Sequence, residues 1–195
     1  CIQVANISED LILEIGGNAM LVRAGALHHD IGKLALPIFF IENQNTGFNP
    51  HNELSYEESA QSIISHVTNG VKLAYKHKLP ESIIDFIRTH HGTSKTKYFY
   101  NRYVAENPDK PIDSTIFTYR GPRPFSRETA VVMMVDAVEA ASRSLKNHSE
   151  SEISKLVDNI INSQIADDHF SNSDITFKDV DKIKDLLKKK LQSIY

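Results

Sequence analysis

The chain has 195 residues, which is enough for one domain with a sizeable core but short for two. With 41% hydrophobic and 24% charged residues, 8 glycines and 7 prolines, it is neither disordered nor collagen-like. A net charge of −3 argues against nonspecific binding to nucleic-acid backbones, so we expect no DNA or RNA partner. A small anionic ligand stays compatible with this charge.

Cys1 is the single cysteine, which excludes an internal disulfide and a cysteine-based zinc ribbon. It favours a reducing compartment such as the cytoplasm. The sequence has no apolar run near the ~18 residues that a membrane span needs. Because the chain starts without a methionine or a signal peptide, we expect a soluble piece of a longer protein.

Helical patterns begin in the first third of the chain. The apolar segment 21–27 leads into Gly32, where we expect a helix to break. Ser55 and Glu58 stand three residues apart, as in a capping box, and an apolar stripe at helical spacing follows them. The pattern predicts a helix over 56–77.

Two further helices are predicted in the middle of the chain. Pro80 fits the first position of a helix that stops at Gly92. Ser126 can cap a long helix whose middle, 130–141, is almost wholly apolar. A helix that is hydrophobic all round belongs at the centre of a bundle, so this segment is the predicted core helix.

The last helices are predicted from their caps. Ser149 with Glu152, and Thr176 with Asp179, each start an amphipathic pattern. Since period-2 alternation is confined to 115–119, which could be a short extended piece, the predicted fold class is all-α.

Two long polar segments, 37–54 and 93–124, separate the predicted helices. Both exceed ordinary connections, and long loops in compact domains are often lids or binding loops. We therefore expect them to border a functional site.

Histidines at the predicted helix ends are candidate metal ligands. His29 and Asp30 can place a nitrogen and an oxygen on one cation while the second carboxylate oxygen reaches another; a surface hydrogen-bonded pair is the alternative. His90 and His91 can share a metal only near a fraying helix terminus, where they lie, or they complement the helix dipole. His66 flanks an apolar stripe, where a boundary histidine without a ligand role is the alternative.

Asp136 lies within the most hydrophobic helix. An ionised carboxylate there costs several kcal/mol unless it is paired or binds a cation. Arg143 is the competing partner, although Glu139, four residues before it, is a nearer match for that arginine. The joint set suits two Mn, Fe or Zn ions that share a carboxylate. Its members are His29, Asp30, His66, His90, His91 and Asp136.

These residues resemble the metal site of the HD-domain phosphohydrolases, spelled H…HD…H…HH…D. The intervals of 36 residues from Asp30 to His66 and 24 from His66 to His90 are similar to those of its two-metal branch. More specifically, the whole chain is similar to the cytoplasmic domain of the seven-transmembrane HD proteins of the PgpH type. The segments that carry this resemblance are Phe39–Gln44, Asn49–His51, His90–Thr93, Tyr98–Tyr100, Gly121–Pro124 and Asp136–Ser144.

The resemblance implies a single HD domain over 1–195, a helical bundle with the two long loops over the metal site. Its first helix would be truncated at the N-terminus, and the helices over 149–195 would pack on the same domain. The domain would hydrolyse cyclic di-AMP to the linear dinucleotide with two Mn or Fe ions, Zn being less favoured. It would lie at the cytoplasmic face of a membrane, below an N-terminal transmembrane region. A homodimer stays open.

The resemblance also implies a role for each ligand. Asp30 would bridge the two ions, His29 and Asp136 would complete one, and the other would be held by His66, His90 and His91. A further histidine of the family would immediately precede Cys1. Residues 91–97 lack the Gly-Tyr-Pro sequence of the cyclic di-GMP branch, which disfavours that substrate.

We expect a hydroxide that bridges the metals to attack phosphorus, with Asp30 and Lys33 as the catalytic residues. Lys33 is a candidate phosphate contact, or a solvent-facing lysine. His51, Arg120 and Arg123 are candidate substrate-binding residues, or loop surface. Two alternatives stay open: a noncatalytic cyclic-dinucleotide receptor module, and an HD phosphohydrolase for another nucleotide.

Overall fold

The computed structural model describes residues 1–44 and 47–195, within which it has eight α-helices and no β-strand. The all-α prediction is confirmed. The helices are α1 (Ile2–Ile15), α2 (Ala19–His28), α3 (Tyr56–Lys76), α4 (Glu81–Thr89), α5 (Lys97–Glu106), α6 (Arg127–Ser142), α7 (Glu150–Ala166) and α8 (Phe177–Ile194). Short 3₁₀ turns are η1 (Ile31–Ala35), η2 (Pro37–Phe39), η3 (Ile41–Asn43), η4 (Pro50–Glu53) and η5 (Ser114–Phe117).

The predicted caps open the helices. Complete capping boxes start α3 at Ser55, α6 at Ser126 and α8 at Thr176, and the Ser149 side chain accepts from the Glu152 amide at the start of α7. The start of α4 differs by one residue. Pro80 is its N-cap, with extended backbone, rather than its first helical residue.

The segment 93–124, predicted as a loop, contains the ten-residue helix α5. This prediction was wrong because α5 buries none of its residues, so its sequence carries no clear apolar stripe. The extended piece expected at 115–119 is mostly the 3₁₀ turn η5, and only Thr118 makes an isolated bridge, to Lys95.

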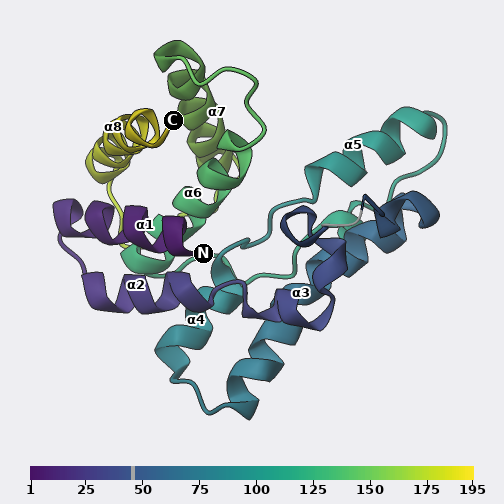
Figure 1. Cartoon of the computed structure of the whole chain (residues 1–195), viewed down its shortest axis with the longest axis horizontal. Helices are drawn as coiled ribbons and strands as arrows, with labels where there is room; N and C mark the ends of the chain where they lie inside the picture. The colour runs from purple at the N-terminus through teal and green to yellow at the C-terminus, as the bar shows by residue number, and fades with distance from the viewer. Residues whose placement is uncertain (45–46) are drawn as a thin grey trace.

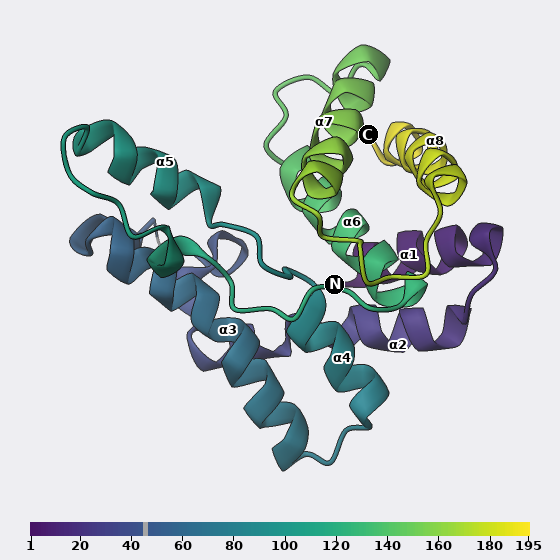
Figure 2. The ribbon, with the colours of Figure 1, turned by 180° about the vertical axis from the view of Figure 1, so that it is seen from behind.

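Five helices form the group that we call the bundle: α1, α2, α6, α7 and α8. In Figures 1 and 2 they gather on one side of the molecule, and contacts join α1 to α2, α6 and α8, and α7 to α6 and α8. Its centre contains fully buried side chains from four of these helices, namely Leu11, Ile12, Met134, Ile153, Ile161, Ile183 and Leu187. The predicted core helix, α6, runs through this centre.

The other side of the molecule is what we call the arm: α3, α5 and the turns η2 to η5. In both views α3 and α5 extend away from the bundle. Helix α4 joins the two parts, because it contacts α2 and α6 on one side and α3 on the other. Ala74, Ile84 and Ile87 form a small buried cluster where α3 meets α4.

The chain starts close to this junction, since the N-terminus lies at the centre of both views. Among the described residues, no helix is both long enough and apolar enough to cross a lipid bilayer.

Candidate metal centre

The six predicted ligands converge where the bundle meets the arm. His29 and Asp30 follow α2, His66 lies in α3, His90 and His91 follow α4, and Asp136 lies in α6. His29, His66 and His90 are buried, and the others are partly buried. Four separate segments therefore contribute to one site.

A contact between two backbones brings Asp30 next to α3. After Asp30, the chain turns through η1, where Gly32 lies against α3. A Cβ atom on Gly32 would lie 1.8 Å from the His66 carbonyl oxygen and 2.4 Å from the Gly70 nitrogen. Because only glycine permits this approach, the carboxylate of Asp30 and the ring of His66 can face the same point.

Three imidazoles are oriented in the same way. The Nδ1 atoms of His29, His66 and His90 lie 2.6, 2.6 and 2.9 Å from the carbonyl oxygens three residues earlier in their helices. A carbonyl oxygen only accepts, so each Nδ1 carries the proton and donates it. In its neutral form, which a metal requires, each ring presents an unprotonated Nε2 to the centre.

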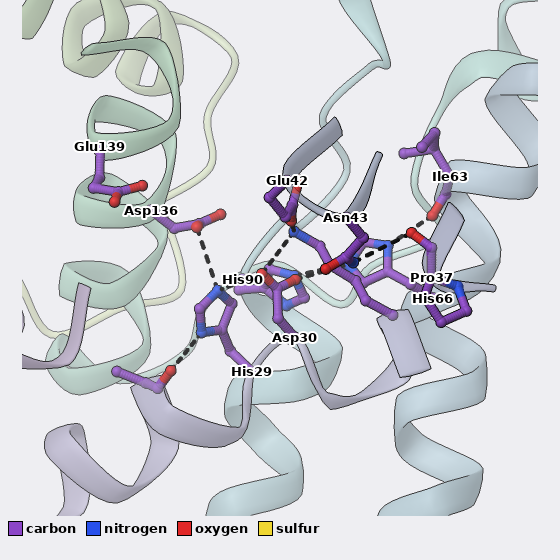
Figure 3. A network of polar contacts seen from close by, with 12 residues as sticks. His29, Asp30, Pro37, Glu42, Asn43, Ile63, His66, His90, Asp136 and Glu139 are labelled. Atoms are coloured by element: carbon purple, nitrogen blue, oxygen red, sulfur yellow. Dashed lines mark hydrogen bonds and ion pairs between the residues drawn. The ribbon is translucent and has the colours of Figure 1, made fainter. Parts of the chain in front are cut away.

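The two oxygens of Asp30 face two different sets of imidazoles. Oδ2 lies 3.3 Å from His29 Nε2, whereas Oδ1 lies 3.5 Å from His66 Nε2 and 3.7 Å from His90 Nε2. Figure 3 shows Asp30 between His29 on one side and His66 on the other. A carboxylate oriented in this way can bind two cations at once.

His66 and His90 are spaced so that they could bind one metal ion together. His66 Nε2 and His90 Nε2 lie 3.1 Å apart, although both Nδ1 protons are already donated to the backbone. Two lone pairs at this distance repel unless a cation or a proton lies between them. With metal–nitrogen bonds of about 2.0–2.1 Å, two nitrogens on one ion lie about 3–3.4 Å apart, so the donors fit a metal.

Asp136 faces the centre, and no arginine neutralises it in the described residues. Its Oδ1 lies 3.3 Å from His29 Nε2 (Figure 3), while Arg143 bonds Glu139 with Nη2 2.5 Å from Oε1. The competing partner considered for Asp136 is thus occupied by its nearer match. Burial raises the pKa of Asp136, but the charge and hydrogen bond of His29 outweigh burial and lower it below its usual value, so the carboxylate is ionised.

The imidazoles separate into two electrostatic classes. Burial opposes the charging of His29, but Asp30 and Asp136 raise its pKa to about 10. Burial, with the neighbouring imidazoles, lowers the pKa of His90 and brings that of His91 to about 3; burial also lowers that of His66. We call His29, Asp30 and Asp136 the bundle side of the centre, and His66, His90 and His91 its arm side. The bundle side has ionised carboxylates beside His29, and the arm side has neutral imidazoles.

In the part of the chain that the structure describes, three groups of candidate ligand side chains have ligand atoms within 4.8 Å of one another. They are His66 with His90 and His91, His29 with His90 and Asp136, and Cys1 with His29 and Asp30. His90 thus borders both sides, and the start of α1 lies beside the bundle side.

The other predicted residues lie around this centre in different ways. Lys33 Nζ lies 2.8 Å from both Asp30 Oδ2 and Glu42 Oε1, and these carboxylates raise its pKa against the effect of burial. His51 donates from Nε2 to the Phe39 carbonyl oxygen, 2.9 Å away.

The two arginines of the second long segment lie near the other face of the paired histidines. Arg120 is exposed and borders a pocket of about 220 Å³ together with His91. The Arg123 guanidinium bonds Asp168 Oδ2 at 2.6 Å and Thr93 Oγ1 at 3.2 Å. In this conformation Arg123 therefore contacts the protein itself.

Two residues at the centre escaped the sequence reasoning. The Tyr119 ring stacks on His91, with centroids 4.2 Å apart and 27° between the planes, and Glu42 holds Lys33. No spacing rule points to Tyr119. Glu42 lies within the segment Phe39–Gln44, which carried part of the resemblance, so a search for ionic partners of Lys33 could have found it.

The fold and the site define a helical domain with a cluster of histidines and aspartates that could hold metal. The HD domain family model matches residues 1–141, and the chain belongs to this family. The predicted family is confirmed.

Two relatives carry the name cyclic-di-AMP phosphodiesterase PgpH. The chain is 42% identical to the Bacillus subtilis protein over 194 residues, which are 100% of this chain and 27% of that protein. It is 39% identical to the Listeria monocytogenes protein over 192 residues, 98% of this chain and 26% of that one. The chain thus spans about a quarter of the length of these relatives.

A solved structure has the same fold over the whole chain. It is the HD domain of Listeria monocytogenes PgpH in complex with cyclic di-AMP, with a TM-score of 0.95 and 39% identity. The match covers 100% of this chain and 90% of that one. The same domain, in a structure described without that ligand, has a TM-score of 0.92 and 38% identity.

Proposed function

We propose that this domain is a metal-dependent phosphodiesterase that hydrolyses cyclic di-AMP to the linear dinucleotide. The observation that carries the proposal is the convergence of four histidines and two aspartates at the junction, with both oxygens of Asp30 directed at different imidazoles. The likeness to a domain that binds cyclic di-AMP supports the choice of substrate.

Imidazole and carboxylate donors suit two Mn or Fe ions, and the family resemblance ranks Zn below them. Asp30 would bridge the ions. His29 and Asp136 would hold the first ion, and His66, His90 and His91 would hold the second. The division into an oxygen-rich side and a nitrogen-rich side supports this assignment.

Bound metal would supply a hydroxide at neutral pH and stabilise the charge on the phosphoryl oxygens. The protein orients this chemistry through the backbone acceptors that fix the three Nδ1–H groups. Lys33 would add a positive charge next to the phosphate. Glu42 holds its ammonium group, and the Phe40 ring lies under it, with Nζ 5.0 Å from the ring centroid.

A cleft of about 1170 Å³ provides room for the dinucleotide. It starts at Phe40 and Glu42, beside His66 and Lys33, and continues between α3 and α5. Aromatic rings and side-chain amides border it, which suits a base that stacks and forms hydrogen bonds. These residues include Phe39, Gln44, Asn49, Asn52, Tyr98 and Phe99. His51 borders it, whereas Arg120 and Arg123 lie elsewhere, so His51 is the better supported substrate contact.

We further propose that residues 1–195 form one domain of a longer protein with an N-terminal transmembrane region. The contacts of α7 with α6 and of α8 with α1 support the inclusion of 149–195 in this domain. The much greater length of the relatives supports the longer protein.

The test is turnover of cyclic di-AMP by the purified chain with added Mn²⁺, with the linear dinucleotide measured by chromatography. Cyclic di-GMP and a nucleoside monophosphate serve as comparison substrates. We expect the linear product from cyclic di-AMP at a higher rate than product from either comparison. Chelation of the metal should abolish turnover, and added Mn²⁺ should restore it.

The outcomes separate the alternatives. Binding of cyclic di-AMP without turnover, in the presence of Mn²⁺, would favour a receptor module. Faster turnover of another phosphoester would favour a different HD phosphohydrolase.

A further inference from the structure

A turn outside the HD family match lies against the paired histidines. The match ends at residue 141, whereas the turn follows α7 and contains Asp168 and His169. His169 is 2% exposed. It lies against Gly92, the residue that directly follows His91.

The contact with Gly92 depends on the backbone of that residue. Gly92 has φ +51°, which L side chains rarely adopt, and a Cβ atom there would lie 3.0 Å from His169 Nδ1. His169 Nδ1 itself is buried without a hydrogen-bond partner in the described residues. The His169 imidazole therefore supports the backbone at Gly92 by filling space rather than through a hydrogen bond from Nδ1.

Asp168 contacts the segment Gly92–Thr93 from a second direction, through Arg123. Its carboxylate bonds Arg123, and the Arg123 Nε atom donates to Thr93 Oγ1, one residue after Gly92. Asp168 has φ +59°, an uncommon conformation for a residue with a side chain. A sparsely populated conformation persists where surrounding contacts fix it, and here it directs the carboxylate to Arg123.

The turn that contains Asp168 and His169 is attached to the core of the bundle. The side chain of Gln164, which is buried, donates to the Met133 carbonyl oxygen in α6 at 3.3 Å. The His169 amide donates to the Gln164 carbonyl oxygen at 3.0 Å. The position of His169 is therefore fixed relative to α6, the helix that contains Asp136.

We propose that Asp168 and His169 are positioning residues that hold the His90–His91 pair in register with Asp136. The inference rests on the proposed function, because it assumes that these histidines bind metal. The segment beyond residue 141 then contributes directly to metal affinity. The α4 end alone leaves His91 at a helix terminus, where backbones fray.

The first experiment measures Mn²⁺ binding by calorimetry without substrate, together with the Mn²⁺ concentration for half-maximal turnover. Asp168→Asn keeps a residue that tolerates the left-handed conformation and removes only the charge. The matched control is Asp174→Asn, since Asp174 is another exposed carboxylate after α7 and pairs with Arg127 at 3.1 Å. We expect Asp168→Asn to weaken Mn²⁺ binding about two- to fivefold, because the pair is exposed, and Asp174→Asn to leave it unchanged.

The second experiment separates positioning from loss of stability. We expect His169→Ala to weaken Mn²⁺ binding about tenfold. Val180→Ala, a buried truncation in α8, should lower the melting temperature without this effect. His169→Phe restores a ring against Gly92 and should restore most of the affinity. In Asp168→Asn and His169→Ala, turnover at saturating Mn²⁺ should be closer to that of the unmodified chain than the Mn²⁺ affinity is.

Three results decide the matter. Equal Mn²⁺ affinity in His169→Ala and Val180→Ala would overturn the inference, as would equal affinity in the two aspartate variants. Failure of the unmodified chain to turn over cyclic di-AMP while it still binds Mn²⁺ would overturn the proposed function alone, whereas failure to bind Mn²⁺ would overturn both.

Discussion

The bundle and the arm differ in how much they bury. The bundle encloses fully buried aliphatic side chains, among them Leu11, Ile161 and Leu187, whereas α5 in the arm has no buried residue. Burial of this kind stabilises a fold by about 25 cal/mol for each Å² of apolar surface removed from water. The helices of the bundle are therefore held in place by buried apolar contacts, and α5 in the arm lacks such contacts.

The candidate metal centre draws on both parts at their boundary. Asp136 comes from the packed centre of the bundle, and His66 comes from α3 in the arm. The cleft proposed for the substrate lies almost wholly on the arm. Asp136 is thus tied to the well-packed bundle, and the cleft proposed for the dinucleotide is tied to the less packed arm.

The largest expected effect follows from removing the carboxylate whose two oxygens face different imidazoles. Asp30→Asn should lower turnover of cyclic di-AMP more than about a hundredfold, because loss of a bridging ligand exceeds the usual cost of losing a supporting residue. Steady-state rates at several Mn²⁺ concentrations measure this. Asp158→Asn, in α7, where the carboxylate pairs with Lys188 of α8, is the control and should keep full activity. Activity in Asp30→Asn close to that of the control would contradict the bridging role.

A pair of truncations sharpens the contrast between the two parts. Leu11→Ala, at a fully buried site of the bundle, should lower the free energy of unfolding by about 2–5 kcal/mol. Tyr98→Ala, at a 66% exposed site of α5, should lower it by less than about 0.5 kcal/mol. Denaturant titrations measure both.

The same pair should behave in the opposite way towards substrate. Since Tyr98 borders the cleft, its truncation should raise KM for cyclic di-AMP several-fold, whereas Leu11→Ala should leave KM unchanged in the folded protein. An unaltered KM in Tyr98→Ala would place the substrate outside this cleft.

The pH dependence of stability should reflect the arm side of the centre. The pKa values of His66, His90 and His91 are lowered in the folded protein from 6.5, so these rings stay neutral there while the unfolded chain takes up protons. Their contribution is fully present above pH 6.5 and is lost as pH falls, by up to about 1.4 kcal/mol per pH unit for each histidine.

His29 has the opposite sign. Its pKa is raised to about 10, so its contribution is present below pH 6.5 and is lost as pH rises towards 10. Thermal unfolding of metal-free protein should therefore show rising stability from about pH 8 to about pH 6.5, where His29 acts alone, and falling stability from about pH 6.5 to about pH 5. A constant or rising melting temperature below about pH 6.5 would contradict the three lowered pKa values.

The smallest expected effect concerns the start of α1. The family resemblance places a histidine immediately before Cys1, and Cys1 already lies beside His29 and Asp30. A chain that carries this histidine should bind Mn²⁺ a few-fold more tightly than one with alanine in its place. Calorimetric titration of both chains measures the difference, and equal affinities would remove this residue from the ligand set.

Local sequence signals predicted much of the bundle and of the site. The caps at Ser55, Ser126 and Thr176 act through neighbouring backbone groups, so a short sequence window contains the whole cause. Asp136 was informative for a similar reason, since a charge within an apolar helix needs a partner.

The features that sequence reasoning missed depend on tertiary contacts. Helix α5 buries nothing and so lacks an apolar stripe, and Tyr119 reaches His91 only because 117–119 pairs with 94–96. The contact of His169 with Gly92 joins segments far apart in the chain. No local pattern encodes any of these.

The contact of Gly32 with α3 has a consequence for how the centre can vary. Since two main chains touch there, the offset between the α2 ligands and His66 is set by atoms that every amino acid shares. Repacking of either part can change stability or substrate fit while this offset stays the same. A single added methyl group at Gly32, by contrast, would push His29 and Asp30 together away from His66. The absence of a side chain at this one position therefore sets the spacing between the two sets of ligands.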